Sequence, residues 1–226
     1  MKIKLSYLFI VLYTLASCQE KTIVNDLKFS NYKGHPKKIT EIVTFANQNF
    51  DKSISYYDKD GFLTKVESYN SINNEFPDQR ELSDILIYDV KNKAKRSFKT
   101  MNAENKEVGA TGYFEKVSDM LYRRVSNVDT PPISLNKLLY LDPNNYLIKT
   151  EETGNFNGKT IHNIIIYTYT NGAKSGLVFE DAANHKKNKL TYKNIKSDPQ
   201  GNFLYEELVD DQGTLQLKTE REFEYY

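Results

Sequence analysis

Residues 214–226 read TLQLKTEREFEYY. Apolar side chains, with one threonine and one arginine, occupy every second position, and charged or amide side chains occupy the positions between them. One face would carry Leu215, Leu217, Thr219, Arg221, Phe223 and Tyr225, and the other Gln216, Lys218, Glu220, Glu222 and Glu224. Successive side chains of a β-strand point to opposite faces, so this alternation predicts a strand with one inward and one solvated face.

Similar strands are expected from Ile39 to the end of the chain. Short β-prone runs are separated by clusters of Asn, Asp and Gly about every 12 to 16 residues, which is typical of all-β proteins. Asn157-Gly158 and Asn171-Gly172 are the clearest hairpin turns, because Asn and Gly tolerate positive φ. Ile161–Tyr169 is apolar on both faces, which predicts a sheet that curls, closes or stacks on a second layer. One short helix is expected at Asp78–Asp84.

An internal repeat links three of the expected turns. Tyr57–Glu67 aligns with Leu141–Glu151 and, more loosely, with Ser197–Glu207. Each copy has an Asp, then a turn residue of the Gly or Asn type, then an apolar residue and a Glu. Such a segment is typical of a hairpin in which Asp bonds its own backbone and Gly or Asn supplies positive φ.

These copies resemble the YD repeats of Rhs-type proteins, which also occur in short bacterial lipoproteins. The ending Leu217–Tyr226 is similar to the C-terminal strand of those lipoproteins. The resemblance implies stacked antiparallel hairpins and no reaction, since the repeats are architectural. The predicted fold is therefore all-β, a long antiparallel meander of about a dozen strands, made of repeated hairpins that form a curved or closed sheet.

The first residues indicate export. A basic start, Met1–Lys4, precedes the apolar run Leu5–Leu15, which is shorter than the roughly 20 residues of a membrane span. Leu15-Ala16-Ser17-Cys18 resembles the lipobox of bacterial lipoproteins, which implies that Cys18 carries the lipid. The alternative is a plain signal peptide followed by an unpaired cysteine.

Three parts follow from this interpretation: a lipoprotein signal peptide (1–17), a lipidated N-terminus and tether (18–38), and a single YD-repeat-like all-β domain (39–226). Gln19 replaces the Asp that would imply inner-membrane retention in lipoproteins. The expected location is therefore the bacterial outer membrane, on either its periplasmic or its surface side. The expected membrane contact is the lipid at Cys18.

Composition excludes several classes of protein. The chain has 226 residues and a formal net charge of +1, without the positive field of a nucleic-acid binder. Its mean hydropathy of −0.64 excludes a bundle of membrane-spanning helices. One cysteine excludes a disulfide scaffold. An integral outer-membrane barrel is not expected either, because the segment Lys93–Lys99 cannot supply an apolar band facing lipid.

The candidate sites have simpler structural interpretations. Gly154–Thr160 has one residue too few between its glycines for a phosphate-binding loop, and it precedes an expected strand, so a hairpin turn is favoured. The three histidines, His35, His162 and His185, lie too far apart for metal-ligand spacing. The acidic pairs fit solvated strand faces or turns: Glu151-Glu152, Glu206-Glu207 and Asp210-Asp211. The many tyrosines fit either cross-strand pairing or a stacking platform for sugars.

No catalytic residue, cofactor or metal ligand is therefore expected, and Cys18 is the one assigned site. The expected function is a non-catalytic, lipid-anchored envelope protein that binds a glycan or an envelope protein through one sheet face. Two alternatives remain: a hydrolase of envelope or extracellular polymers using carboxylates from separate strands, and a structural or assembly lipoprotein with an unpaired sheet edge.

Overall fold

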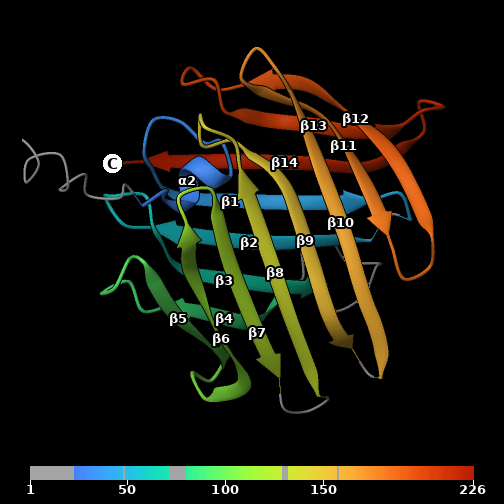
Figure 1. Cartoon of the computed structure of the whole chain (residues 1–226). Helices are drawn as coiled ribbons and strands as arrows, with labels where there is room; N and C mark the ends of the chain where they lie inside the picture. Colours follow the sequence, from blue (N-terminus) through green and yellow to red (C-terminus); the bar gives the residue numbers. More distant parts are fainter. Residues whose placement is uncertain (1–22, 48, 72–79, 129–131, 157) are drawn as a thin grey trace, which may run out of the picture.

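The computed structural model describes residues 23–47, 49–71, 80–128, 132–156 and 158–226, and these form a β-barrel with one short helix (Figure 1). The helix is α2 (Asp26–Phe29). The strands are β1 (Pro36–Phe45), β2 (Phe50–Tyr57), β3 (Leu63–Ser71), β4 (Arg80–Tyr88), β5 (Lys95–Asn102), β6 (Glu107–Ser118), β7 (Leu121–Val128), β8 (Ile133–Leu141), β9 (Leu147–Phe156), β10 (Lys159–Thr170), β11 (Ala173–Asp181), β12 (Lys186–Ser197), β13 (Phe203–Asp210) and β14 (Leu215–Tyr225).

The strands form a closed antiparallel meander. Each pairs with its neighbours in sequence, and β1 pairs with β14, where Ile39 lies opposite Phe223. In Figure 1 the strands β7 to β11 cross β1 to β4 at a large angle, as expected for strands tilted around a barrel. The all-β meander is confirmed, with 14 strands instead of about a dozen. Closure leaves these strands no unpaired edge, so strand addition at an edge, the basis of the assembly alternative, is not available.

The expected helix at Asp78–Asp84 is wrong for its described residues. Arg80 to Asp84 belong to β4, and Asp84 pairs with Asn102 of β5. Residues 78 and 79 lie outside the described part of the chain. The period of two continues through β4, where Asp84 and Leu86 line the barrel interior while Ile87 is exposed outside. Pairing on both sides of the strand outweighs the weak local preference for helix.

The inward and outward faces follow the alternation in the sequence. Thr219 and Arg221 of β14 face the interior as expected, and Thr219 is 2% exposed. On β10, Ile165 faces inward between Thr150 and Phe179. Ile166 points outward and is 43% exposed. This strand is therefore covered on one face only, because the sheet closes on itself instead of stacking on a second layer.

The outer wall is polar and linked by ion pairs. The ammonium of Lys65 lies 4.0 Å from the centre of the Tyr56 ring and 2.8 Å from a carboxylate oxygen of Glu67. Further lysines on outward positions combine an aromatic contact and an ion pair in the same way: Lys95 with Tyr113 and Glu115, Lys149 with Tyr140 and Glu151, and Lys218 with Tyr205 and Glu220. These outward tyrosines are covered by lysine side chains, so they do not form a free stacking platform.

The repeat seen in the sequence is one hairpin loop, and it occurs five times among the described residues. In each loop the first residue, Asp or Asn, accepts hydrogen bonds from backbone N–H groups further along the loop, and its own N–H bonds the carbonyl four residues later. The fourth residue has positive φ. The loops begin at Asp58, Asn102, Asp142, Asp198 and Asp210.

Gly213 tests the backbone requirement of this loop. Its φ is +81°, and a Cβ there would meet nothing within 4 Å. Gly213→Ala should therefore lower the free energy of unfolding by about 1 kcal/mol through the left-handed backbone alone. Gly213→Asn should cost less, since Asn105 and Asn145 occupy the same loop position. Urea unfolding of both variants measures the difference, and an equal cost would contradict this account.

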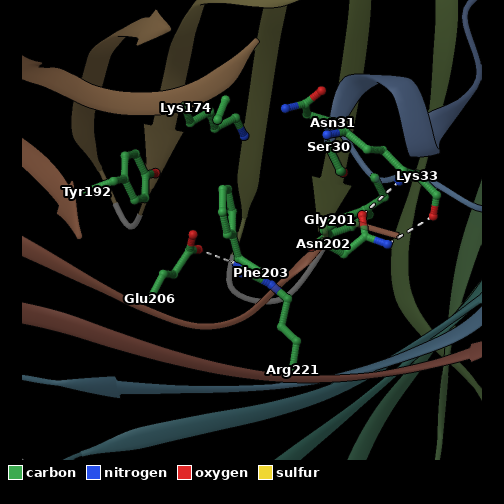
Figure 2. A pocket seen from close by; sticks show the side chains of 12 residues that line it. Ser30, Asn31, Lys33, Lys174, Tyr192, Gly201, Asn202, Phe203, Glu206 and Arg221 are labelled. Carbon is green, nitrogen blue, oxygen red and sulfur yellow. Dashed lines mark hydrogen bonds and ion pairs between the residues drawn. The ribbon is translucent and has the colours of Figure 1, made fainter. Parts of the chain in front are cut away.

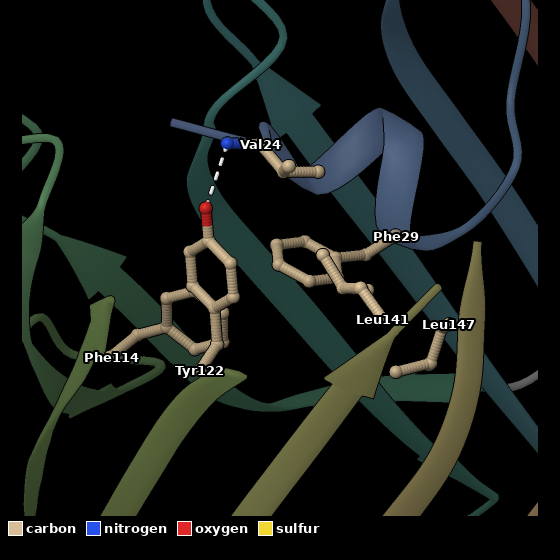
Figure 3. Close-up of a cluster of buried hydrophobic side chains, with 6 residues drawn as sticks. All are labelled: Val24, Phe29, Phe114, Tyr122, Leu141 and Leu147. Carbon is tan, nitrogen blue, oxygen red and sulfur yellow. Dashed lines mark hydrogen bonds between the residues drawn. The ribbon is translucent and has the colours of Figure 1, made fainter. Parts of the chain in front are cut away.

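Residues 23–35 close one end of the barrel, and we call this segment the plug. Figure 3 shows Phe29 of α2 against Phe114 and Tyr122, with ring centres 5.5 and 4.8 Å apart. The Tyr122 hydroxyl accepts a 2.8 Å hydrogen bond from the Val24 N–H. The segment 18–38 was expected as a tether, but from Ile23 onward it packs on the barrel, and β1 begins at Pro36.

Candidate binding site in the barrel lumen

The barrel interior contains three neighbouring cavities. The lumen cavity, about 570 Å³, is lined by Leu63, Val66, Ser68, Asp84, Leu86, Tyr88, Thr100, Val108, Ala110, Arg124 and Val128. The junction cavity, about 280 Å³, lies beneath the plug and shares Leu63, Tyr88 and Arg124 with the first. The Arg221 pocket, about 140 Å³, shares Ser30 and Lys174 with the junction cavity.

The lumen cavity is largely apolar and reaches the end of the barrel opposite the plug. Val66 and Leu86 line it from β3 and β4. Val108 begins the inward positions of β6 beside the hairpin at residues 103–106, and it is 36% exposed. Val128 ends β7 at the same side. Apolar walls with a few polar groups are typical of small-molecule sites, whose volumes are commonly about 300–1,000 Å³.

Three cations line the junction cavity: Arg124, Lys137 and Lys174. The ammonium of Lys137 lies 3.7 Å from a carboxylate oxygen of Glu152. Arg124 lies with its guanidinium carbon 5.1 Å from the centre of the Phe98 ring, and its buried Nε has no hydrogen-bond partner. Among the described residues, only Lys137 has an acidic partner within ion-pairing distance. Arg124 and Lys174 therefore line the cavity without an ion-pair partner.

Lys174 of β11 lines both the junction cavity and the Arg221 pocket, and Figure 2 shows it among the residues of the Arg221 pocket. Its ammonium lies 5.0 Å from the centre of the Tyr167 ring, and it makes no ion pair with a described residue. Burial lowers the pKa of Lys174, and the nearby Arg221 charge lowers it further, while smaller contributions from Glu206 and Glu41 raise it. A buried ammonium without a paired carboxylate is unfavourable, which is why its charged form is disfavoured.

The two inward carboxylates that meet are Glu41 and Glu206. Arg221 donates from a terminal nitrogen to Glu206 at 2.7 Å, as drawn in Figure 2, and from Nε to Glu41 at 2.6 Å. Both side chains accept hydrogen bonds from the same guanidinium, whereas glycosidase chemistry needs two carboxyl groups directed at one substrate bond. This pair therefore gives no support to the hydrolase alternative.

Two buried side chains of the barrel, Arg96 and Asn202, help to fix the plug over these cavities. Arg96, 1% exposed, donates to both carboxylate oxygens of Asp26 at 2.6 and 2.9 Å. Asn202, 2% exposed, accepts from the Lys33 N–H at 2.8 Å and donates to the Lys33 carbonyl at 2.9 Å. Both contacts join the plug to hairpins or strand ends on the same side of the barrel, so they hold the cavities closed at that side.

Asp198 makes the contact between Asn202 and the plug dependent on pH, because it accepts hydrogen bonds from Asn202. Burial alone would raise its pKa, but hydrogen bonds donated by the Tyr225 hydroxyl and by Asn202 lower the pKa of Asp198. A lowered folded-state pKa stabilises the fold above the unfolded pKa of about 3.9, and this contribution is lost as the pH falls through the folded value.

We therefore expect Asp198→Asn to lower the free energy of unfolding by about 1 kcal/mol at neutral pH and to reduce its loss on acidification. Urea unfolding at a series of pH values below 5 measures both effects. Asp211→Asn, in an exposed turn, is the control and should change neither. If the free energy of unfolding falls by the same amount on acidification in the Asp198→Asn variant and in the unaltered protein, the assignment is contradicted.

Most residues considered from the sequence lie outside this site. His162 faces outward, 3.2 Å from Glu151. Glu151 and Glu152 point to opposite sides of β9, as expected, as do Glu206 and Glu207 on β13. Residue 157 lies outside the described part of the chain, but Phe156 ends β9, Lys159 begins β10 and the two residues pair, so the hairpin interpretation of Gly154–Thr160 is confirmed. Cys18 lies outside the described residues. Among those described, no three His, Cys, Asp or Glu side chains form a metal-binding group.

Arg124 and Lys174 were not identified from the sequence. A cation predicts an inward-facing charged residue when the residues two positions before and after it face the barrel interior. Arg221 shows this pattern, because it lies between Thr219 and Phe223. The phase of Arg124 is ambiguous, since each of the two adjacent arginines shares its phase with two apolar or aromatic residues of β7: Leu121 and Val125 for Arg123, and Tyr122 and Val128 for Arg124. Arg123 in fact points outward and bonds Glu115.

No helix among the described residues has the length and apolar character needed to cross a membrane.

No protein-family model matches the sequence, and no relative is found among curated proteins. Among solved structures, a porin-like protein from Bacteroides vulgatus aligns over 85% of this chain and 99% of its own, with 9% identity and a TM-score of 0.52. A porin-like protein from Bacteroides uniformis aligns over 85% of this chain and 98% of its own, with 10% identity and a TM-score of 0.39. The first likeness concerns the fold: this chain is similar to that porin-like protein in its antiparallel barrel architecture.

Proposed function

We propose that this protein is a lipid-anchored, non-catalytic binding protein of the bacterial cell envelope, and that its ligand occupies the barrel lumen. The observation that carries the proposal is the contrast between the two faces of the wall. The lumen cavity is lined by Val66, Leu86, Val108 and Val128, whereas the outer wall carries lysine–glutamate pairs. An apolar surface enclosed by a water-compatible wall is suited to hold an apolar molecule.

The polar outer wall also supports a peripheral position. A barrel that spans an outer membrane presents an apolar band about 25 Å tall to lipid. Here ion pairs occur along β3, β9 and β14, as in Lys65–Glu67, Lys149–Glu151 and Lys218–Glu220. The proposed attachment is the lipid at Cys18, with the barrel in the aqueous phase. The YD-repeat resemblance supports the same class of lipoprotein, and the side of the outer membrane stays open in this proposal.

The lumen binding is tested with the chain from Gln19 onward, which contains every described residue of the barrel and the plug. Nile red, a neutral apolar dye, is the probe, and its fluorescence should rise on binding to the unaltered protein. Ala110→Trp places a large ring in the lumen cavity and should abolish the rise. Thr111→Trp, on the exposed face of the same strand, should leave it unchanged. Absence of binding, or equal loss in both variants, would contradict a lumen site.

The anchor is tested separately in cells. Processing of the full chain should be sensitive to globomycin, which blocks lipoprotein signal cleavage, and Cys18→Ala should abolish both processing and membrane attachment. A Cys18→Ala protein that is processed and retained normally would refute the lipid anchor while leaving the lumen site unaffected.

A further inference from the structure

Resting on the proposed lumen binding, we infer that the ligand is a single-chain amphiphile whose acyl chain lies in the lumen cavity and whose anionic head group lies between Arg124 and Lys174. The inference assigns the junction cavity as a head-group site. It is carried by the two cations that lack an ion-pair partner, by the three lining residues that the two cavities share, and by the position of Asp84 in the lumen cavity.

Among the described residues, two of the cations that line the junction cavity have no carboxylate in direct contact. The Asp26 carboxylate is bound by Arg96, and Lys137 has Glu152 within 3.7 Å. Among the residues that line this cavity, those pairs leave Arg124 and Lys174 without a carboxylate. Buried charges are normally paired, because an unpaired charge loses the stabilisation that water would give it. An anionic group placed between them would supply that partner.

On the far side of Lys174, Arg221 with Glu41 and Glu206 carries a formal charge of −1, which favours the charged form of Lys174 from a distance but gives its ammonium no ion-pair partner. Glu206 is the inward acid of the neighbouring Arg221 pocket, and it is already held by Arg221 at 2.7 Å. Glu41 is held by the same arginine at 2.6 Å. The Lys174 ammonium contacts the Tyr167 ring and makes no ion pair with either glutamate. Lys174 is therefore available to an anion that enters from the junction cavity.

Arg124 is placed to bind a carboxylate or phosphate. Its guanidinium is flanked by the Phe98 ring, and its buried Nε lacks a partner. Phe98 in turn lies over Gly112, where a Cβ would come within 2.4 Å of the ring. A guanidinium held by an aromatic ring can present two parallel donors to an oxyanion, which gives Arg an advantage over Lys at such sites.

The two cavities adjoin, because Arg124, Tyr88 and Leu63 line both. A chain attached to a head group at Arg124 would pass Leu86 and reach Val108 near the far end of the barrel. Asp84 lines the lumen cavity and not the junction cavity, so an acid placed part-way along the lumen would face a like charge. This arrangement sets the direction: the head group lies beneath the plug and the tail points to the far end.

Dodecanoate and dodecanol test the inference, because they share a chain and differ in the head group. Each is titrated against Nile red bound to the protein, below its solubility limit, with inorganic phosphate as a third competitor. Dodecanoate should displace the dye about tenfold more effectively than dodecanol. Phosphate alone should not displace it. Equal displacement by acid and alcohol would overturn the anionic head group and leave lumen binding intact, whereas no displacement by either would overturn both.

Paired variants locate the head group. Arg124→Gln with Lys174→Gln should weaken dodecanoate about tenfold or more and leave dodecanol nearly unchanged. Arg123→Gln, on the outward face of the same strand, is the matched control and should alter neither ligand. Removing unpaired cations should not lower the Tm, so a fall in Tm with loss of both ligands would contradict the assigned role. An Arg123→Gln effect equal to that of the double variant would also overturn it.

Discussion

Replacing Arg96 with methionine is expected to lower the free energy of unfolding by about 3–5 kcal/mol, the cost of breaking a buried ion pair from one side. Arg96 is 1% exposed and donates to both carboxylate oxygens of Asp26 in the plug. Its guanidinium carbon also lies 4.9 Å from the centre of the Phe114 ring and 5.3 Å from that of Phe62. Without Arg96, the Asp26 carboxylate loses its counter-charge in a site closed by the barrel wall.

Urea unfolding measures this effect, and Arg123→Met is the matched control. Arg123 pairs with Glu115 on the outer wall, where its side chain is 40% exposed and screened by water, so its loss should destabilise the protein much less than the loss of Arg96. The double variant Arg96→Met with Asp26→Leu should be more stable than the sum of its single variants predicts, because no buried charge is left unpaired. Equal costs for Arg96→Met and Arg123→Met would show that the plug contact contributes nothing particular.

The second large effect is expected for Phe29→Ala, at about 3–5 kcal/mol. The Phe29 side chain is 7% exposed and packs edge-on against Phe114 and Tyr122 in the cluster that joins the plug to the barrel. Its removal would leave a cavity among rigid aromatic rings that cannot collapse around the gap. The fluorescence of Nile red in the lumen should change as well, since Phe29 lines the junction cavity.

Phe45→Ala is the control for Phe29→Ala, since it removes the same side chain from the end of β1, where Phe45 is 39% exposed. Its cost should be about 1 kcal/mol or less. Thermal and urea unfolding give both values. Similar costs for the two variants would mean that the plug is attached to the barrel only weakly.

The strands and turns were predictable because local chemistry determines them. Alternation at Leu215–Tyr225 assigns one face to the interior, and Asp or Asn followed by Gly or Asn determines the hairpin loops whatever the rest of the chain does. Barrel closure has no such local signature. The pairing of Ile39 with Phe223 depends on the number and tilt of all the strands between them.

The plug and the cationic site could not be predicted for related reasons. α2 has four residues, far fewer than a helix needs to be stable alone, so it depends on contacts such as Phe29 with Tyr122. Arg123 and Arg124 are adjacent, so only one of them can face the barrel interior. The alternation of apolar residues in the sequence is compatible with either. Lys174 pairs with Tyr169 at a register shift, since the preceding residue Thr168 pairs with Gly176. The alternation of side chains in the sequence does not reveal this shift, so it does not predict that Lys174 faces inward.

The pairing of β1 with β14 also determines when this protein can fold. Hairpins can form as soon as their two strands are present, but the seam between Ile39 and Phe223 joins residues separated by almost the whole described chain. Folds dominated by such distant contacts reach the native state slowly, commonly in milliseconds to seconds. Until β14 is available, the edge of β1 has no partner and can pair with other chains. We therefore expect this barrel to complete folding only after the entire chain has left the ribosome, with a rate limited by closure of this seam.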